Sequence, residues 1–321
     1  MNSLIIGIIF TFTTLIFLLS CSSPNKRANL VDTNLIMQSE ESIELQKYYE
    51  RTSKRLRSRG LLRTDNGAID HPYNAKNLSE NFLKIALYDE YKIENGSYVA
   101  KEAKRKLKRW RNPIIINIIH GETNTRKQIE ADTKNIENFA RRLSNLTNLP
   151  IEIGTKPGNF ILLFLNINEQ KRFGKKLETL MPLLTPSMAK AITSSPRSIF
   201  CSAFTLTKSP KDYEYVSAII LIKSEHKNLM RKSCIHEEMA QAMGLSNDSK
   251  FAKPSIFNDD EEFALLTNHD ENLLKILYDN RLQPGMDANE TQQIVTKIAK
   301  ELLSYKNFKL FNTIRRDEQN E

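Results

Sequence analysis

One run of residues limits the fold of this chain more than any other feature: PIIINIIHG, from Pro113 to Gly121. It is apolar and largely β-branched, whereas a strand with one solvated face alternates apolar and polar residues. The run therefore predicts a strand that is buried on both faces of a sheet. Four further strands are expected, and the turn-rich KSPKDYE joins the last two: LPIEIG at 149–154, NFILLFLNI at 159–167, SIFCSAFTLT at 198–207 and YVSAIILIKS at 215–224.

Helical patterns lie between and before these strands. Residues 43–60 are rich in helix-forming side chains and end at Gly60, a residue suited to a helix C-cap. Residues 77–91 place Leu78, Phe82, Ile85 and Tyr88 or Tyr91 at helical spacing. A third helix after residue 121 has an apolar side made of Ile129, Ile136, Phe139, Ala140 and Leu143, and residues 175–192 form another helical stretch. This order of elements predicts an α+β fold.

The N-terminus indicates export. The first twenty residues carry no charge and are dominated by Ile, Leu, Phe and Thr, so we expect residues 1–20 to be a signal peptide. Leu18-Leu19-Ser20-Cys21 resembles the lipobox of bacterial lipoproteins, which implies acylation of Cys21 and a bilayer as the first partner. An uncleaved anchor is the alternative, since about 18 to 20 apolar residues can span a bilayer. Residues 21–37 are polar and predict a flexible tether.

The compartment follows from the residues after the lipobox. Ser22 and Ser23 stand where an Asp would suggest retention at the inner membrane, so the resemblance favours the outer membrane and a domain facing the periplasm. With Cys21 acylated, only Cys201 and Cys234 remain in a compartment where disulfides persist. One bridge between them is expected, and two free buried thiols are the alternative.

Composition is ordinary for a folded chain, with 40% hydrophobic residues and 26% charged residues, but the net charge is +9. Outside the cytoplasm such an excess points to lipid head groups or anionic envelope polymers and not to nucleic acid. The densest basic run, Lys101 to Asn112, surrounds Trp110. We interpret it as the solvated face of a helix.

The stretch CIHEEMAQAMGLSND, Cys234 to Asp248, lies close to the zinc-protease signature H-E-x-x-H. Read from His236 the pattern fails, because Ala240 has no atom to offer a metal. Read from Glu237 it follows H-E-x-x-H-x-x-G-x-x-H in spacing, with Glu237, Gln241 and Asn247 in place of the histidines. Residues four apart share a helix face, so Glu237 and Gln241 are expected to lie together. Glu238 takes the general-base position.

Several stretches together resemble an uncharacterised family of proteobacterial lipoproteins, a domain of unknown function that is similar to metzincin-type zincin peptidases. They are LLRTDN at 61–66, NFLKIALYDEY at 81–91, KRWRNPIIINI at 108–118, CIHEEMAQAMGLSND at 234–248, SIFNDDEE at 255–262 and HDENLLKILYDNRLQPGM at 269–286. The resemblance implies a twisted sheet, a backing helix and an active-site-type helix. It also implies that Met286 occupies the methionine turn beneath the site.

The residues that stand in place of the histidines determine which metal, if any, the site could bind. Zinc peptidases use neutral imidazoles, whereas Glu, Gln and Asn form an oxygen-only set that suits Ca²⁺ better. We therefore expect no resident metal, and a hydrogen-bonded cluster of Glu237, Glu238, Gln241 and Asn247 that replaces it. A rebuilt Zn or Ca centre is one alternative, using His236 and Glu237 with a distant ligand: Glu261, Glu262 or His269. A second is metal-free cleavage of glycosidic bonds by Glu238 with Asp248.

These observations predict a degenerate zincin-like domain that binds a partner or acts as a scaffold in the cell envelope. The candidate partners are anionic envelope polymers or another envelope protein. The expected cleft contains Glu237, Glu238, Gln241, Asn247 and Asp248, with Met286 packed beneath. The alternative is an active metallohydrolase, a peptidase or cell-wall hydrolase, with Glu238 as general base. The expected divisions are a helical region at 38–112, the zincin-like domain at 113–305 and a polar tail at 306–321.

Overall fold

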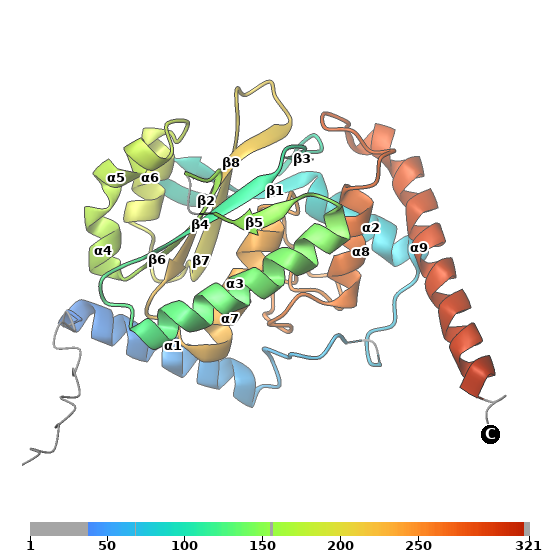
Figure 1. Ribbon diagram of the computed structural model, residues 1–321, viewed down its shortest axis with the longest axis horizontal. Coiled ribbons are helices and arrows are strands. Elements are labelled where there is room, and N and C mark those ends of the chain that lie inside the picture. Colours follow the sequence, from blue (N-terminus) through green and yellow to red (C-terminus); the bar gives the residue numbers. More distant parts are fainter. Residues whose placement is uncertain (1–37, 68, 155–156, 318–321) are drawn as a thin grey trace, which may run out of the picture. The chain divides into compact units, whose positions relative to one another are not determined.

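The computed structural model describes residues 38–67, 69–154 and 157–317, with side chains described as far as Ser304. The expected signal peptide, Cys21 and the whole of the expected tether lie outside the described residues. The described residues all belong to one compact unit, shown in Figure 1. None of the described helices is both long enough and apolar enough to cross a membrane.

The main sheet has the strand order β3-β8-β6-β4-β5, and all of these neighbours are parallel. The strands are β3 (Arg109–Trp110), β4 (Ile114–His120), β5 (Ile151–Ile153), β6 (Phe160–Leu165) and β8 (Glu214–Lys223). β7 (Cys201–Thr207) pairs antiparallel with β8. The predicted strands and the predicted late hairpin are therefore confirmed.

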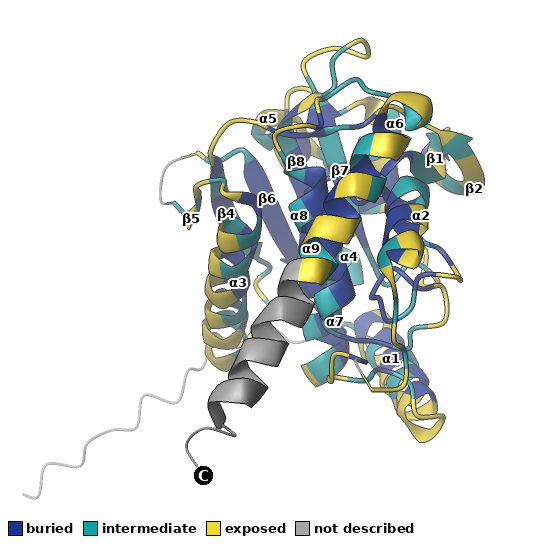
Figure 2. Ribbon diagram, turned by 90° about the vertical axis from the view of Figure 1, so that its right-hand side faces the viewer, coloured by how far each residue is buried: buried dark blue, intermediate teal, exposed yellow. Residues whose placement is uncertain are grey.

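Helices cover both faces of this sheet, which is why its strands are continuous apolar runs. On one face, Ile116, Leu162 and Ile220 pack in a core with α2 (Ala75–Ala86), α3 (Arg126–Thr147), α7 (Asn228–Gln241), α8 (Asn268–Leu277) and α9 (Ala288–Asp317). On the other face, Leu163 and Leu221 pack against α5 (Gly174–Leu180) and α6 (Pro186–Thr193). Figure 2 shows the buried strands between these layers. The α+β prediction is confirmed.

Two helical predictions fail between residues 87 and 112. α2 ends at Ala86, and β1 (Tyr88–Glu94) and β2 (Ser97–Lys104) form a separate antiparallel hairpin. Its turn is Asn95-Gly96, with φ of +52° and +81° at the two residues. Asn-Gly is the preferred sequence of a two-residue hairpin turn, so this signal was present in the sequence. The basic run around Trp110 is strand and loop, and Trp110 is buried.

Other boundaries also differ from expectation. The helical stretch at 175–192 is divided into α5 and α6, because Pro182 and Pro186 interrupt it. α4 (Ile167–Arg172) precedes them, and α9 extends to Asp317, so the expected polar tail begins inside this helix. α1 (Glu40–Ser58) confirms the first predicted helix. It is fixed to the rest of the unit by hydrogen bonds from Ser42 Oγ to Glu225 Oε1 (2.9 Å) and from Tyr49 Oη to the Arg197 carbonyl (3.0 Å).

A buried ion cluster fixes α7 against α3 and β4. Arg231 of α7 donates through Nε and Nη2 to the two oxygens of Asp132, at 2.9 and 2.7 Å, and through Nη2 to Asn124 Oδ1. His120 at the end of β4 bonds the same carboxylate at 3.0 Å. Burial alone would raise the pKa of Asp132, but the hydrogen bonds from His120 and Arg231 lower it overall. The cluster therefore holds an ionised carboxylate inside the protein and sets the orientation of α7.

Candidate functional site

A cleft of about 700 Å³ lies between the β1–β2 hairpin, β7 and α7. Glu237, Glu238 and Gln241 of α7 line it, and so does Asp248 in the loop after the helix. These four residues come from the motif that the sequence analysis selected. The structure therefore brings together most of the predicted cleft.

The predicted disulfide forms one side of this cleft. Cys201 and Cys234 are bonded, with their Cα atoms 5.8 Å apart, and both residues line the cleft. The bond joins the first residue of β7 to the middle of α7. Two contacts thus fix the position of α7: the disulfide to β7 and the ion pair between Arg231 and Asp132.

Asn247 and Met286 do not lie where they were expected. The side-chain amide of Asn247 donates to the Lys84 carbonyl (3.0 Å), so it completes the C-terminal end of α2 instead of facing Gln241. The carbonyl of Met286 accepts a hydrogen bond from the Leu107 amide (2.8 Å), and Met286 is not a lining residue of the cleft. The path of the chain after α7 explains the position of Asn247. Gly244 at φ +124° passes so close to the Lys108 carbonyl that a Cβ there would lie 2.4 Å from it, which directs the chain toward α2.

His236 points away from the cleft, into the core beside α3. Its ring stacks on Phe139 with the centroids 4.1 Å apart, and its Nδ1 accepts a hydrogen bond from the Leu266 amide (3.2 Å). Burial lowers the pKa of His236 to about 3, so the ring is neutral. His236 is a core residue and not a partner of Glu237.

The residues present do not fit the zinc site that the zincin resemblance implies. Of the three shifted positions, Glu237 and Gln241 face the cleft and Asn247 does not. The alternative set also fails, because His236 is in the core, His269 is buried beside Asn81, and Glu262 is bonded to His71. Among the described residues, no group of three His, Cys, Asp or Glu side chains is placed to hold a metal ion.

The expected hydrogen-bonded cluster is also wrong in part. Glu238 is only 4% exposed, yet its Oε2 has no hydrogen-bond partner within the described part of the chain. The same holds for Oδ1 of Asp248. An unpaired buried carboxylate costs free energy, so these side chains do not stabilise the fold in the manner expected of a structural cluster.

Two further carboxylates line the cleft: Glu90, which was not predicted as a site residue, and Glu261, which was expected only as a ligand in the alternative metal site. Glu90 lies at an irregularity in β1, where the pairing register shifts between Asp89 and Tyr91. A bulge of this kind redirects a side chain out of the alternating pattern, and Glu90 lines the cleft. The adjacent charged residues Asp89 and Glu90, in a half-buried strand, were the sequence feature that could have indicated Glu90 as a site residue. Glu261 enters the cleft from a loop far along the chain.

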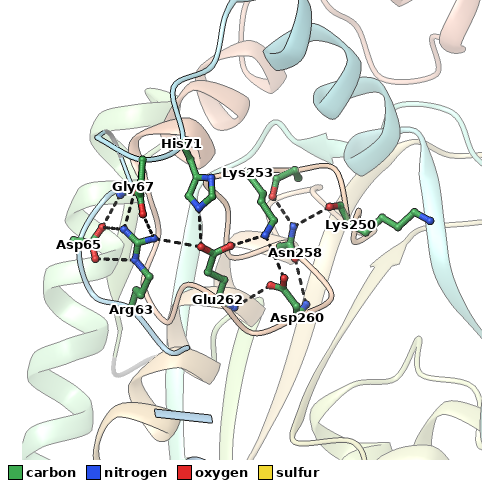
Figure 3. A network of polar contacts seen from close by, with 11 residues as sticks. Arg63, Asp65, Gly67, His71, Lys250, Lys253, Asn258, Asp260 and Glu262 are labelled. Atoms are coloured by element: carbon green, nitrogen blue, oxygen red, sulfur yellow. Dashed lines mark hydrogen bonds and ion pairs between the residues drawn. The ribbon is translucent and has the colours of Figure 1, made fainter. Parts of the chain in front are cut away.

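The loop that carries Glu261 is held by the polar network in Figure 3. Glu261 adopts φ +59°, an unfavourable conformation for a residue with a Cβ. Its neighbour Glu262 bonds His71 Nε2 (2.7 Å), Lys253 Nζ (2.8 Å) and Arg63 Nη1 (3.3 Å). The Leu62 amide also donates to the Glu261 carbonyl (2.9 Å). The surroundings thus maintain a strained backbone at the site, which is common where a side chain must be aimed at a ligand.

Burial raises the pKa of every one of these carboxyls, and repulsion from nearby carboxylates raises it further. Burial is the largest cause throughout. Repulsion from Glu261 adds most to the effect on Glu237, and repulsion from Asp248 adds most to the effect on Glu238. Burial likewise raises the pKa of Tyr98, to about 12. Two cations also line the cleft: Arg105, which is paired with Asp89 (2.8 Å), and Lys108.

These pKa shifts predict how stability depends on pH. A carboxyl with a raised pKa binds its proton more tightly in the folded protein, so the free energy of unfolding falls as pH rises from about 4.5 toward the raised value. Glu238→Gln is expected to lose less stability than the wild type over this window, measured by urea unfolding between pH 4.5 and about pH 8. The exposed Glu137→Gln is the matched control. Parallel profiles for wild type and Glu238→Gln would contradict the assigned environment.

Comparison with known proteins gives a family and no activity. The family described as "Protein of unknown function (DUF2927)" matches residues 75–297. The match begins at α2 and extends into α9, so it includes the sheet, α7 and the whole cleft. No curated protein matches the chain.

Proposed function

Because the chain belongs to DUF2927, a family of unknown function, we propose a function from its own residues. It is a membrane-anchored periplasmic lipoprotein whose cleft binds an extended segment of another envelope protein without cleaving it. The single observation that carries this proposal is that two strand edges border one cleft that also contains unpaired carboxylates.

The pattern of lining residues shows that the cleft meets the edges of two strands. A cleft over the face of a strand would be lined by every second residue, whereas a cleft at its edge is lined by consecutive residues. Five consecutive residues of β7, Cys201–Thr205, line the cleft, and so do Asp89, Glu90 and Tyr91 of β1. Among the described strands, β7 pairs only with β8 and β1 only with β2. Edge strands carry unpaired backbone groups, and an extended peptide that enters the cleft can bond to them as an added strand.

The absence of cleavage is proposed from the chemistry of the motif. Glu238 faces the cleft, but Gln241 replaces the second imidazole and Asn247 is directed toward α2. A carboxylate base that has no electrophile beside it cleaves peptide bonds poorly. The cleft is also lined by carboxylates, so anionic envelope polymers would have to bind on another surface.

A hydrolase is the second candidate. The buried carboxyl of Glu238, whose pKa is raised first by burial and then by Asp248, has the environment of a general acid or base. Asp248 lines the same cleft, so Glu238 and Asp248 together could act as the carboxylate pair of a glycoside hydrolase. A metallohydrolase would need an ion held by residues other than the predicted sets.

Anchoring at the outer membrane is part of the proposal and rests on the Leu18–Cys21 stretch. Cys21→Ser should abolish labelling by a fatty-acid analogue and block normal signal removal. Labelling that persists in the variant would refute the lipobox interpretation.

The binding proposal is tested by blocking the cleft. Random displayed peptides of about ten residues, the length of one strand, are selected on the full chain in mild detergent. Thr205→Trp places an indole on the β7 edge and is expected to weaken the selected peptides by about tenfold or more. Lys127→Trp, on the exposed face of α3, is the matched control. Selected peptides that bind both variants equally would show that the cleft is not the binding site.

A further inference from the structure

The lining of the cleft has more carboxyl groups than cations to pair with them. Five of its carboxyl groups form no ion pair within the described residues, and they come from four segments, namely β1, α7 and two loops: Glu90, Glu237, Glu238, Asp248 and Glu261. Arg105 is not available to them, because it is bonded to Asp89 and to the Tyr215 hydroxyl (2.6 Å). Lys108 is the second cation in the lining. The chain as a whole has a net charge of +9, so this excess is local to the cleft.

Glu238, a buried residue of the cleft lining, has a carboxylate oxygen without a hydrogen-bond partner among the described residues. This oxygen is Oε2, and the residue is more than nine-tenths buried. A buried carboxylate oxygen without a donor is costly, and a ligand that brings a charged donor removes this cost. An ammonium or guanidinium group would serve, because both donate hydrogen bonds and carry positive charge.

The rest of the lining suits the stems of long basic side chains. Tyr91, Tyr98 and Phe204 line the cleft beside the carboxylates, and Met188 of α6 lies among them. Lysine and arginine pack their aliphatic stems on apolar or aromatic surface while the charged end reaches a polar group. Aromatic faces also attract the cationic groups themselves.

We infer that the polypeptide segment bound between the two strand edges is basic, with lysine or arginine side chains that reach the cleft carboxylates. This rests on the proposed function, since it names the chemistry of the segment that the cleft takes. The bound segment supplies both the backbone groups that pair with β1 and β7 and the cations that pair with Glu237 and Glu238.

Three blocked peptides of about ten residues test the charge requirement. One alternates valine with lysine, one valine with acetyl-lysine, and one valine with glutamate. Each is labelled and titrated with the full chain in mild detergent, and binding is followed by fluorescence anisotropy. The lysine peptide is expected to bind about tenfold or more tightly than the acetyl-lysine peptide, and the glutamate peptide should bind most weakly.

Variants assign this preference to the cleft. Glu237→Gln/Glu238→Gln should abolish the difference between the lysine and acetyl-lysine peptides, whereas the matched pair Glu130→Gln/Glu137→Gln, on the exposed face of α3, should keep it. The cleft variant removes buried like charges, so its thermal unfolding midpoint should be no lower than that of the wild type. A preference that survives in the cleft variant would assign it to the surface and overturn the inference.

The remaining outcomes separate this inference from the proposed function. Equal binding of lysine and acetyl-lysine peptides, both blocked by Thr205→Trp, would overturn the basic ligand and leave the peptide cleft intact. Binding of none of the peptides, with spermidine binding that depends on Glu237 and Glu238, would overturn both in favour of a small polyamine.

Discussion

Arg231→Met is expected to lower the free energy of unfolding by about 3 to 5 kcal/mol. The arginine and Asp132 are both buried, with side chains 6% and 4% exposed, and the substitution would leave the carboxylate of Asp132 without its main cationic partner. Because Arg231 also bonds Asn124, the contact of α7 with the loop before α3 is lost as well. Urea unfolding at neutral pH measures the change.

Two controls distinguish an uncompensated charge from lost packing. Arg126→Met removes an arginine whose side chain is 88% exposed and should change stability by less than about 1 kcal/mol. Arg231→Met/Asp132→Leu removes both charges and should recover much of the loss, since a buried ion pair exchanged for apolar residues is often neutral. A double variant that is no more stable than Arg231→Met would show that packing, and not charge, dominates.

Removing the disulfide is expected to have a similarly large effect. Cys201 and Cys234 are 33 residues apart, and closing a loop of this length restricts the unfolded chain by about 3 to 4 kcal/mol on the entropy model. Cys201→Ala/Cys234→Ala should lose about this much, measured by urea unfolding without reductant. Because the bond joins β7 to α7, the variant should also lose peptide binding at the cleft before it unfolds globally.

The wild type in reductant is the matched control, because it breaks the same bond without changing side-chain volume. It should unfold at nearly the urea concentration found for the double alanine variant. Equal stability of oxidised and reduced wild type would contradict the assigned contribution of the bond.

The sheet could be predicted from the sequence because its signal is local. β6 and most of β8 are buried on both faces, and β4 is buried or half-buried along its length, so their apolar runs identify them without knowledge of their neighbours. The β1–β2 hairpin is partly exposed and carries many charges, and the helical patterns predicted at 77–91 and 101–112 overlap its two ends. Only the Asn95-Gly96 turn in its sequence indicates a hairpin.

The site was predictable only where helix periodicity decides it. Glu237, Glu238 and Gln241 line one cleft, as expected, because all three lie on α7 and spacing along a helix fixes their direction. Asn247 lies beyond the helix end, where Gly244 and the Lys108 carbonyl set the path of the chain. The spacing of residues in the motif does not predict the contact between Gly244 and the Lys108 carbonyl.

Glu90 and Glu261 depend on still longer-range structure. Glu90 faces the cleft because of a bulge in a strand whose existence was not predicted. Glu261 faces it because Arg63, His71 and Lys253 hold the neighbouring Glu262. Glu90 was therefore not predicted from the sequence, and Glu261 was expected only as one of three alternative ligands in a metal site.

The most direct test of this account measures metal content, because the central claim is that the carboxylates of the cleft bind a ligand without a resident metal. The protein is purified from membranes without chelators and analysed for Zn, Ca, Mg and Mn. We predict less than about a tenth of an equivalent of any metal, with the same values in Glu237→Gln/Glu238→Gln. About one equivalent of Zn or Ca that is lost in this variant would contradict the account and favour the metallohydrolase.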